Sequence, residues 1–77
     1  MIKLLLFSHL QEAVGKPELI IDKNEITVIE LKCWLQEQYE GIQLRGVMSA
    51  INEEYAEDQD KICSGDIVAL IPPVSGG

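Results

Sequence analysis

The chain has 77 residues, of which 47% are hydrophobic, and its 13 acidic and 6 basic residues give a formal net charge of −7. This length corresponds to one small domain, and the apolar share is typical of a folded protein rather than a disordered one. The negative charge argues against nucleic acid and anionic membranes as partners, because their phosphates would repel it, and favours basic protein partners.

The apolar runs and the cysteines exclude further classes of protein. No apolar run approaches the roughly 20 residues that span a bilayer, and the run at residues 2–7 lacks the cleavage site of a signal peptide. Cys33 and Cys63 are too few for a disulfide framework, and they lack the spacing and the second histidine of a metal site. We therefore expect a reduced cytoplasmic protein with no bound metal.

The first part of the chain predicts a strand, a short helix and a second strand. Residues 2–7 form a short apolar segment that is typical of a strand. Ser8 and Gln11 then have the spacing of a capping box, and Gly15 marks the end of the short helix. Residues 18–22 predict the second strand.

A turn at residues 23–25 leads into the longest predicted helix. Thr27 and Glu30 have the spacing of a second capping box, and the helix should run to about Tyr39, before Gly41 stops it. At 100° per residue one apolar stripe should face the core, formed by Val28, Leu31, Leu35 and Tyr39.

The second half of the chain predicts further strands. We expect a strand at residues 47–52, a turn at 53–54 and a short return strand at 55–56. A connector at 58–64 should then lead to a last strand at 67–71. Pro72 and Pro73 end the last strand, because proline cannot donate to a sheet ladder. One long helix on one face of a mixed sheet is an α+β arrangement.

Two of the predicted strands, the first and the last, are apolar on both sides. A strand with one face in water should alternate apolar and polar residues, so the second face of these strands needs a cover. An exposed apolar patch usually marks an interface. Either a partner binds there, or the loop at 40–46 or the short helix folds over it. The predicted docking residues on this face are Leu5, Phe7, Ile67, Ala69 and Ile71.

The last four residues, Val74, Ser75, Gly76 and Gly77, predict a flexible tail on a domain formed by residues 1–73. Fully extended, four residues span roughly 13 to 14 Å. The glycines carry no side chain, so the tip fits a narrow channel. Once ATP has activated the carboxylate of Gly77, sulfur on that carbonyl would give a thiocarboxylate, a carrier of sulfide.

The ending of the chain resembles that of a known family. Residues 65–77, GDIVALIPPVSGG, are similar to the ending of the sulfur-carrier small subunits of molybdopterin synthase, the MoaD family of ubiquitin-like β-grasp proteins. The resemblance covers nearly the whole chain. Its weaker parts are the apolar first strand into Phe7, the helix with Leu10, Glu12 and Gly15, the helix start at Thr27, Val28 and Leu31, and Ala50-Ile51-Asn52.

The resemblance implies a chain that is not catalytic alone. A MoeB-like E1 enzyme would adenylate Gly77 with ATP, and a sulfur donor protein would convert it to the thiocarboxylate. The tail, with Gly76, Ser75, Val74 and Pro73, would then enter the large synthase subunit, which holds the catalytic pocket. There it would donate sulfur to cyclic pyranopterin monophosphate to form the molybdopterin dithiolene. The family complex is a heterotetramer with two small subunits at its ends, and no cofactor is bound to the small subunit itself.

The sequence departs from the family pattern at one position, and three alternative functions are weighed against the sulfur-carrier role. Many members carry an Arg-Glu pair where this chain has Gln11 and Glu12, so a contact made by that arginine is in doubt. A thiamine-type sulfur carrier has similar chemistry but usually lacks the two prolines. A ubiquitin-like protein modifier would be joined to lysines through Gly77. A stand-alone enzyme is disfavoured, because His9 is the single histidine and Cys33 has no base partner.

Overall fold

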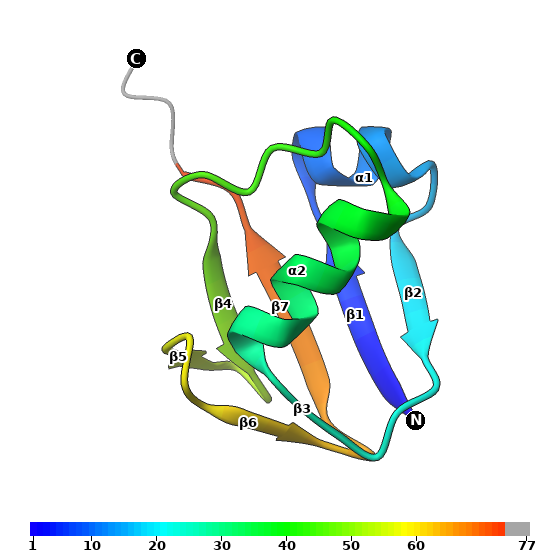
Figure 1. Cartoon of the computed structure of the whole chain (residues 1–77). Coiled ribbons are helices and arrows are strands. Elements are labelled where there is room, and N and C mark those ends of the chain that lie inside the picture. The colour runs from blue at the N-terminus through cyan, green and yellow to red at the C-terminus, as the bar shows by residue number, and fades with distance from the viewer. Residues whose placement is uncertain (74–77) are drawn as a thin grey trace.

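The computed structural model describes residues 1–73 as two helices and seven short strands (Figure 1). In chain order the elements are β1 (Ile2–Leu6), α1 (Ser8–Val14), β2 (Glu18–Ile21), β3 (Glu25–Thr27), α2 (Val28–Gln38), β4 (Met48–Ile51), β5 (Glu54–Ala56), β6 (Lys61–Cys63) and β7 (Ile67–Ile71).

Five of these strands form one mixed sheet in the order β2-β1-β7-β4-β5. The central strands β1 and β7 are parallel, and the other neighbours are antiparallel. The helix α2 crosses one face of this sheet, and α1 lies at one end of it (Figure 1). This confirms the predicted α+β class, with a mixed sheet and its long helix on one face.

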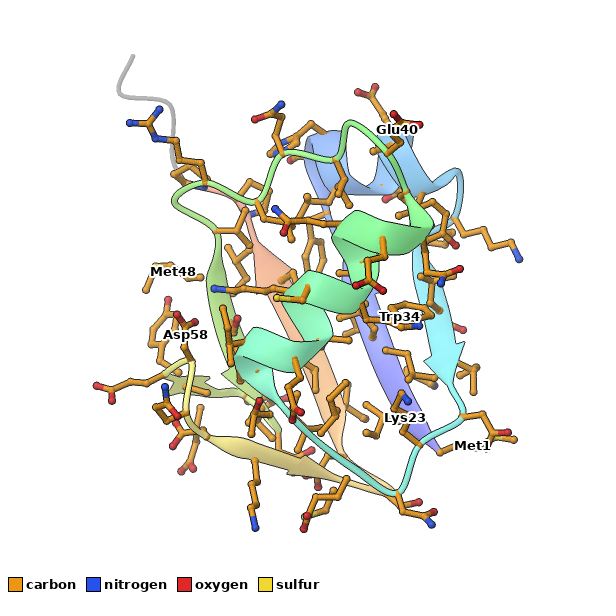
Figure 2. All side chains as sticks on the ribbon, in the orientation of Figure 1. Met1, Lys23, Trp34, Glu40, Met48 and Asp58 are labelled. Carbon is orange, nitrogen blue, oxygen red and sulfur yellow. The ribbon has the colours of Figure 1, made fainter. Side chains whose placement is uncertain are left out.

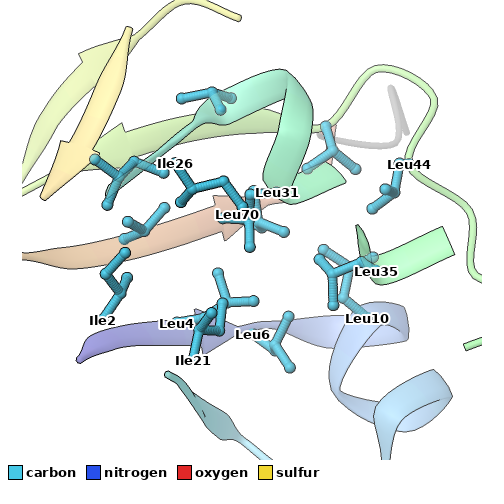
Figure 3. Close-up of a cluster of buried hydrophobic side chains, with 14 of the residues drawn as sticks. Ile2, Leu4, Leu6, Leu10, Ile21, Ile26, Leu31, Leu35, Leu44 and Leu70 are labelled. Atoms are coloured by element: carbon cyan, nitrogen blue, oxygen red, sulfur yellow. The ribbon is translucent and has the colours of Figure 1, made fainter. Parts of the chain in front are cut away.

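The core fills the layer between the sheet and α2 (Figure 3). Val28, Leu31 and Leu35 on α2 are fully buried, as the helical stripe predicts, and Tyr39 is half-buried at the end of the same stripe. The sheet contributes the other side of the core, mainly through Ile2, Leu4, Leu6, Val68 and Leu70. Trp34 packs on the flank, on the side of α2 toward β2 (Figure 2).

The two predicted capping boxes have different outcomes. In α2 the Thr27 side chain accepts from the backbone N–H of Glu30, and the Glu30 carboxylate accepts from the backbone N–H of Thr27, which confirms that box. The box at Ser8 is wrong. Phe7 occupies the N-cap of α1 with no side-chain hydrogen bond, and Ser8 has a positive φ of 49°. Gly15 ends α1 in the left-handed conformation as predicted.

The strands β3 and β6 were not predicted. Each has a single apolar residue between polar neighbours, so neither has enough alternation to indicate a strand. Their pairing places Ile26 opposite Ile62, and both side chains are buried. The strand β6 therefore lies inside the predicted connector at 58–64, whereas β3 begins at Glu25, the last residue of the predicted turn, and continues to Thr27. The turn before β5 falls at Asn52 and Glu53, one residue earlier than predicted.

Candidate docking face and tail exit

The pairing register brings the five predicted docking residues to one side of the sheet. Leu5 lies opposite Ala69 on β7, and directly paired residues project to the same side. Ile67 and Ile71 alternate with the buried Val68 and Leu70, so they share the side of Ala69. Phe7 continues the alternation of β1, because its backbone is extended at φ −126° and ψ 155°.

The same register adds residues that the sequence analysis missed. Met48 pairs with Ile71, Ile20 pairs with Lys3, and Tyr55 pairs with Ala50, which itself lies opposite Ala69. Met48, Ile20 and Tyr55 are identified by the pairing between strands, and the sequence of a single strand does not show with which strand it pairs. We call the whole surface the open face and define it as Leu5, Phe7, Ile20, Met48, Ala50, Tyr55, Ile67, Ala69 and Ile71. Ala50 is buried among its neighbours, and the other members are exposed or half-buried.

Within residues 1–73, no helix or loop packs over the open face. The loop after α2 turns its apolar residues to the opposite side, because Ile42 and Leu44 belong to the buried core cluster. The short helix α1 does the same with Leu10, which is fully buried (Figure 3). The alternative that the loop at 40–46 or the short helix covers this face is therefore wrong for the described part of the chain.

The open face has an apolar centre and a polar rim. Phe7, Met48 and Ile67 are 45%, 49% and 44% exposed. A shallow depression lies over Leu5, Ile67 and Ala69, and Asn52 and Glu53 complete its lining. Lys3 on β1, between Ile20 and Ile67, extends its ammonium to 4.0 Å from the Glu18 carboxylate on the edge strand β2. An apolar centre inside a polar rim is the usual anatomy of a protein–protein interface.

Asn52 and Asp66 fix one end of this face. The Asn52 side chain donates to Asp66 Oδ1 (3.0 Å) and accepts from the backbone N–H of Ile67 (3.0 Å). The other oxygen of Asp66 accepts from the backbone N–H of Cys63 (2.8 Å). These two hydrogen bonds, that from Cys63 first, lower the pKa of Asp66, because they stabilise its charged form. The network ties the turn before β5 to the start of β7.

The tail leaves the sheet at the end of β7. The last ladder pair joins Ile71 to Met48, after which Pro72 is half-buried and Pro73 is exposed. The predicted tail residues lie outside the described residues 1–73, and these are Val74, Ser75, Gly76 and Gly77. The exit of the tail therefore adjoins the edge of the open face, where Met48 and Ile71 lie.

The other candidate chemical groups are dispersed. In the tautomer with its proton on Nε2, His9 donates to the carbonyl oxygen of Gln43 (3.0 Å), which ties α1 to the loop after α2. Cys33 and Cys63 are free, exposed thiols on different elements. Across residues 1–73, no three His, Cys, Asp or Glu side chains are grouped to hold a metal ion. The helices described are also too short to cross a membrane.

Comparisons with known proteins show which solved structures have a similar fold. The chain is similar to small archaeal modifier protein 1 from Methanosarcina acetivorans, with a TM-score of 0.77 and 26% identity over 99% of this chain and 95% of that one. It is also similar to a chain in the complex of subunits 1 and 2 of the molybdopterin-converting factor from Helicobacter pylori, with a TM-score of 0.69 and 26% identity over 99% and 97% of the two chains.

A mixed sheet crossed by one long helix, with these structural relatives, defines a ubiquitin-like β-grasp protein. Residues 4–77 match the ThiS family. The molybdopterin synthase sulfur carrier subunit of Dictyostelium discoideum is 43% identical over 97% of this chain and 94% of its own length. The chain therefore belongs to the ThiS family, and the resemblance to molybdopterin synthase sulfur carriers that its ending predicted is confirmed.

Proposed function

We propose that this chain is the sulfur carrier subunit of molybdopterin synthase, with Gly77 as its reactive residue. One observation carries the proposal: the ending Pro-Pro-Val-Ser-Gly-Gly follows directly on β7, whose outer side belongs to an exposed apolar face. The 43% identity to a sulfur carrier subunit from Dictyostelium discoideum supports the choice of pathway.

The proposed chemistry takes place on the carboxylate of Gly77. A carboxylate oxygen attacks the α-phosphorus of ATP on a MoeB-like E1 enzyme, and pyrophosphate leaves. Sulfur from a donor protein, at the oxidation level of sulfide, then attacks the acyl carbon. The C–S bond forms, the C–O bond to AMP breaks, and AMP leaves with the electron pair. The product is the thiocarboxylate, and the side chains of the domain take little part.

Delivery of the sulfur takes place in the large subunit. The thiocarboxylate sulfur attacks a carbon of cyclic pyranopterin monophosphate that bears oxygen, so that a C–S bond forms, a C–O bond of that carbon breaks, and the oxygen leaves with the electron pair. Water then cleaves the thioester, which leaves sulfur on the substrate and restores the carboxylate of Gly77. Two such transfers form the dithiolene. The chain is thus not catalytic alone, and the large subunit supplies the acids and bases. ATP serves the activating enzyme rather than this chain.

We assign the docking of the large subunit to the open face. The Helicobacter pylori structure contains subunits 1 and 2 of the molybdopterin-converting factor together, which supports a partner of this kind. Fully burying a large apolar side chain contributes about 1.5 to 3 kcal/mol, so burial of a few residues of this face against a partner would contribute several kcal/mol to binding. We propose a heterotetramer in the cytoplasm, where the two exposed thiols stay reduced.

The first prediction concerns sulfur loading. After incubation with activating enzyme, ATP and sulfur donor, the intact protein should gain the mass of one sulfur in place of one oxygen, located at Gly77 by fragmentation. Deletion of Gly77 should abolish the gain while binding of the large subunit persists, since docking resides on the open face. No gain in the parent chain, where an established carrier is charged in parallel, would refute the proposal.

A second candidate is protein modification. The likeness to a small archaeal modifier protein favours it, because a modifier would use the same activated carboxylate of Gly77 to acylate a lysine amine. Conjugates that survive a denaturing gel and disappear when Gly77 is deleted would support this candidate. A thiamine-type carrier would instead restore thiazole synthesis in cells that lack their own carrier, and Pro72 and Pro73 disfavour it.

A further inference from the structure

The turn between β4 and β5 contains a residue in an unfavourable backbone conformation. Ile51 pairs with Glu54, so Asn52 and Glu53 form a two-residue turn, and their φ angles are 50° and 72°. Two positive φ angles define a type I′ turn, whose usual sequence is Asn-Gly. Asparagine tolerates this conformation, whereas glutamate adopts it only at a cost in stability. Glu53 therefore stands where this turn favours glycine.

Hydrogen bonds to the start of β7 hold this turn in place. The backbone N–H of Asn52 donates to the carbonyl oxygen of Ile67 (2.8 Å), and the Asn52 side chain bonds both Asp66 and the backbone N–H of Ile67. The conformation at Glu53 is thus imposed by its surroundings. Strained residues that are held in this way are concentrated at functional sites, which directs attention to the Glu53 side chain.

The Glu53 side chain lines the shallow depression on the open face. The other lining residues are the apolar Leu5, Ile67 and Ala69, together with Asn52. The oxygen and the nitrogen of the Asn52 amide are both already hydrogen-bonded within the protein. The exposed carboxylate of Glu53 is therefore the polar group of this depression that is best placed to bind a partner.

The end of the open face at Glu53 is negatively charged. Within residues 1–73, the ion pairs join Lys3 to Glu18, Lys32 to Asp58 and Lys61 to Glu25, and none involves Glu53. Lys3 is also on this side of β1, but its ammonium extends toward Glu18 on the edge strand. The half-buried Asp66 adds a second carboxylate beside Asn52. A cationic group of a partner is therefore attracted to this depression.

We propose that the depression receives an arginine side chain of the large subunit, with its aliphatic stem over Leu5 and Ala69 and its guanidinium on the Glu53 carboxylate. A long basic side chain buries its stem against apolar surface while its charged end stays paired. Arginine fits better than lysine, because its guanidinium is planar and less strongly hydrated and can bind a carboxylate through two parallel hydrogen bonds. The inference rests on the proposed function and deepens it.

The position of Glu53 gives this contact a role in specificity. Along β4, Ile51 pairs with Val68 and Met48 pairs with Ile71, so the turn lies about 10 Å from the end of β7 where Met48 lies. Figure 1 shows the turn after β4 and the end of β7 at opposite ends of the sheet. Apolar contacts have no direction, whereas a charge pair fixes how the partner is placed along the strands.

The simpler explanation is that Glu53 is only a solvated residue of a surface turn. Glu54 separates the two explanations. It is also exposed, and it alternates with Tyr55, so it projects to the side of the hairpin away from the open face. Glu53→Gln and Glu54→Gln change the net charge equally, while only the first removes a carboxylate from the depression.

The test measures the dissociation rate and the affinity for the large subunit, together with the thermal midpoint of each variant. We expect Glu53→Gln to dissociate about ten-fold faster, because loss of one member of an interface charge pair acts mainly on dissociation. Its midpoint should equal that of the parent, since the backbone is unchanged. Glu54→Gln should dissociate at the parent rate.

Glu53→Gly separates binding from folding. Glycine adopts the positive φ without strain, so the midpoint should rise by about 4 °C, while dissociation should again be about ten-fold faster. A variant that is more stable and yet binds less tightly cannot owe its weaker binding to unfolding. A lower midpoint for Glu53→Gly would contradict the strain at position 53 and overturn the inference.

A double-mutant cycle identifies the partner's side chain. Each arginine on the surface of the large subunit is replaced by alanine, and one of these changes should be non-additive with Glu53→Gln. Equal dissociation rates for Glu53→Gln and Glu54→Gln, or additive effects for every arginine, overturn the inference.

Failure of the proposed function gives a different result. The parent chain itself would then neither bind the large subunit nor gain sulfur. If only the present inference fails, the parent binds and gains sulfur, and Glu53→Gln binds as the parent does.

Discussion

At the scale of single residues, Thr27 and Glu30 fix the start of α2 by two reciprocal hydrogen bonds of 3.2 and 2.9 Å. We predict that Thr27→Ala lowers the free energy of unfolding by about 1 kcal/mol, because a backbone N–H at the helix start loses its acceptor. Urea unfolding followed by circular dichroism measures this. Ser8→Ala is the matched control, since Ser8 caps nothing. An equal loss in both variants would contradict the assignment of the caps.

The lowered pKa of Asp66 predicts how the stability of the fold depends on pH. The hydrogen bonds from Cys63 and Asn52 hold the pKa of Asp66 below its ordinary value. A carboxyl group with a lowered folded pKa stabilises the protein above its unfolded pKa, and this contribution is lost as the pH falls through the folded pKa. Stability should therefore decrease below about pH 4, where an unperturbed aspartate protonates.

Asp66→Asn provides the control for this pH dependence. The variant should be less stable than the parent at pH 7, and the difference between the two should shrink as the pH falls below about 4. Unfolding free energies measured at a series of pH values test both statements. A difference that stays constant down to the lowest pH would show that the Asp66 carboxylate does not contribute through its charge.

At the scale of an element, β7 serves the core with one side and the open face with the other. Leu70 is fully buried, whereas Ile71, the next residue, is half-buried on the open face. We predict that Leu70→Ala costs about 2 to 5 kcal/mol of stability, because it leaves a cavity. Ile71→Ala should cost about 1 kcal/mol or less and weaken large-subunit binding instead. The reverse order of stabilities would mean that the faces of β7 are exchanged.

At the scale of the whole molecule, the sheet separates a covered side from an uncovered one. We predict that Phe7→Asp on the open face weakens large-subunit binding by ten-fold or more, about 1.4 kcal/mol, because the partner would bury an unpaired carboxylate. The control is Ile29→Asp on α2, which is similarly exposed at 39% and lies on the other side of the sheet. Titration calorimetry measures the affinities, and thermal melts test whether both variants stay folded.

Equal weakening of large-subunit binding by Phe7→Asp and Ile29→Asp would contradict this prediction. The docking surface would then extend beyond the open face to the helical side of the molecule. Unfolding of Phe7→Asp alone would also contradict the assignment, because a residue that is 45% exposed at the end of β1 should not be required for the core.

The sequence alone determined the elements whose signals are local. Each of these signals depends on residues that are close together in the sequence. They are the capping box at Thr27, the helical stripe of Val28, Leu31 and Leu35, and the last strand before two prolines. The capping box predicted at Ser8 is wrong because its sequence spacing is present without the N-cap backbone geometry. The φ of Ser8 is positive, and Phe7 occupies the N-cap instead. The family assignment was also local, because the ending of the chain carried it.

Tertiary structure decided what depends on pairing between distant segments. Ile26 and Ile62 form a strand pair that neither segment predicts alone, and Ile20, Met48 and Tyr55 join the open face through the register of their neighbours. Local sequence sets backbone preference and the side each residue faces, but only packing of the whole chain determines which faces meet and which one stays open for a partner.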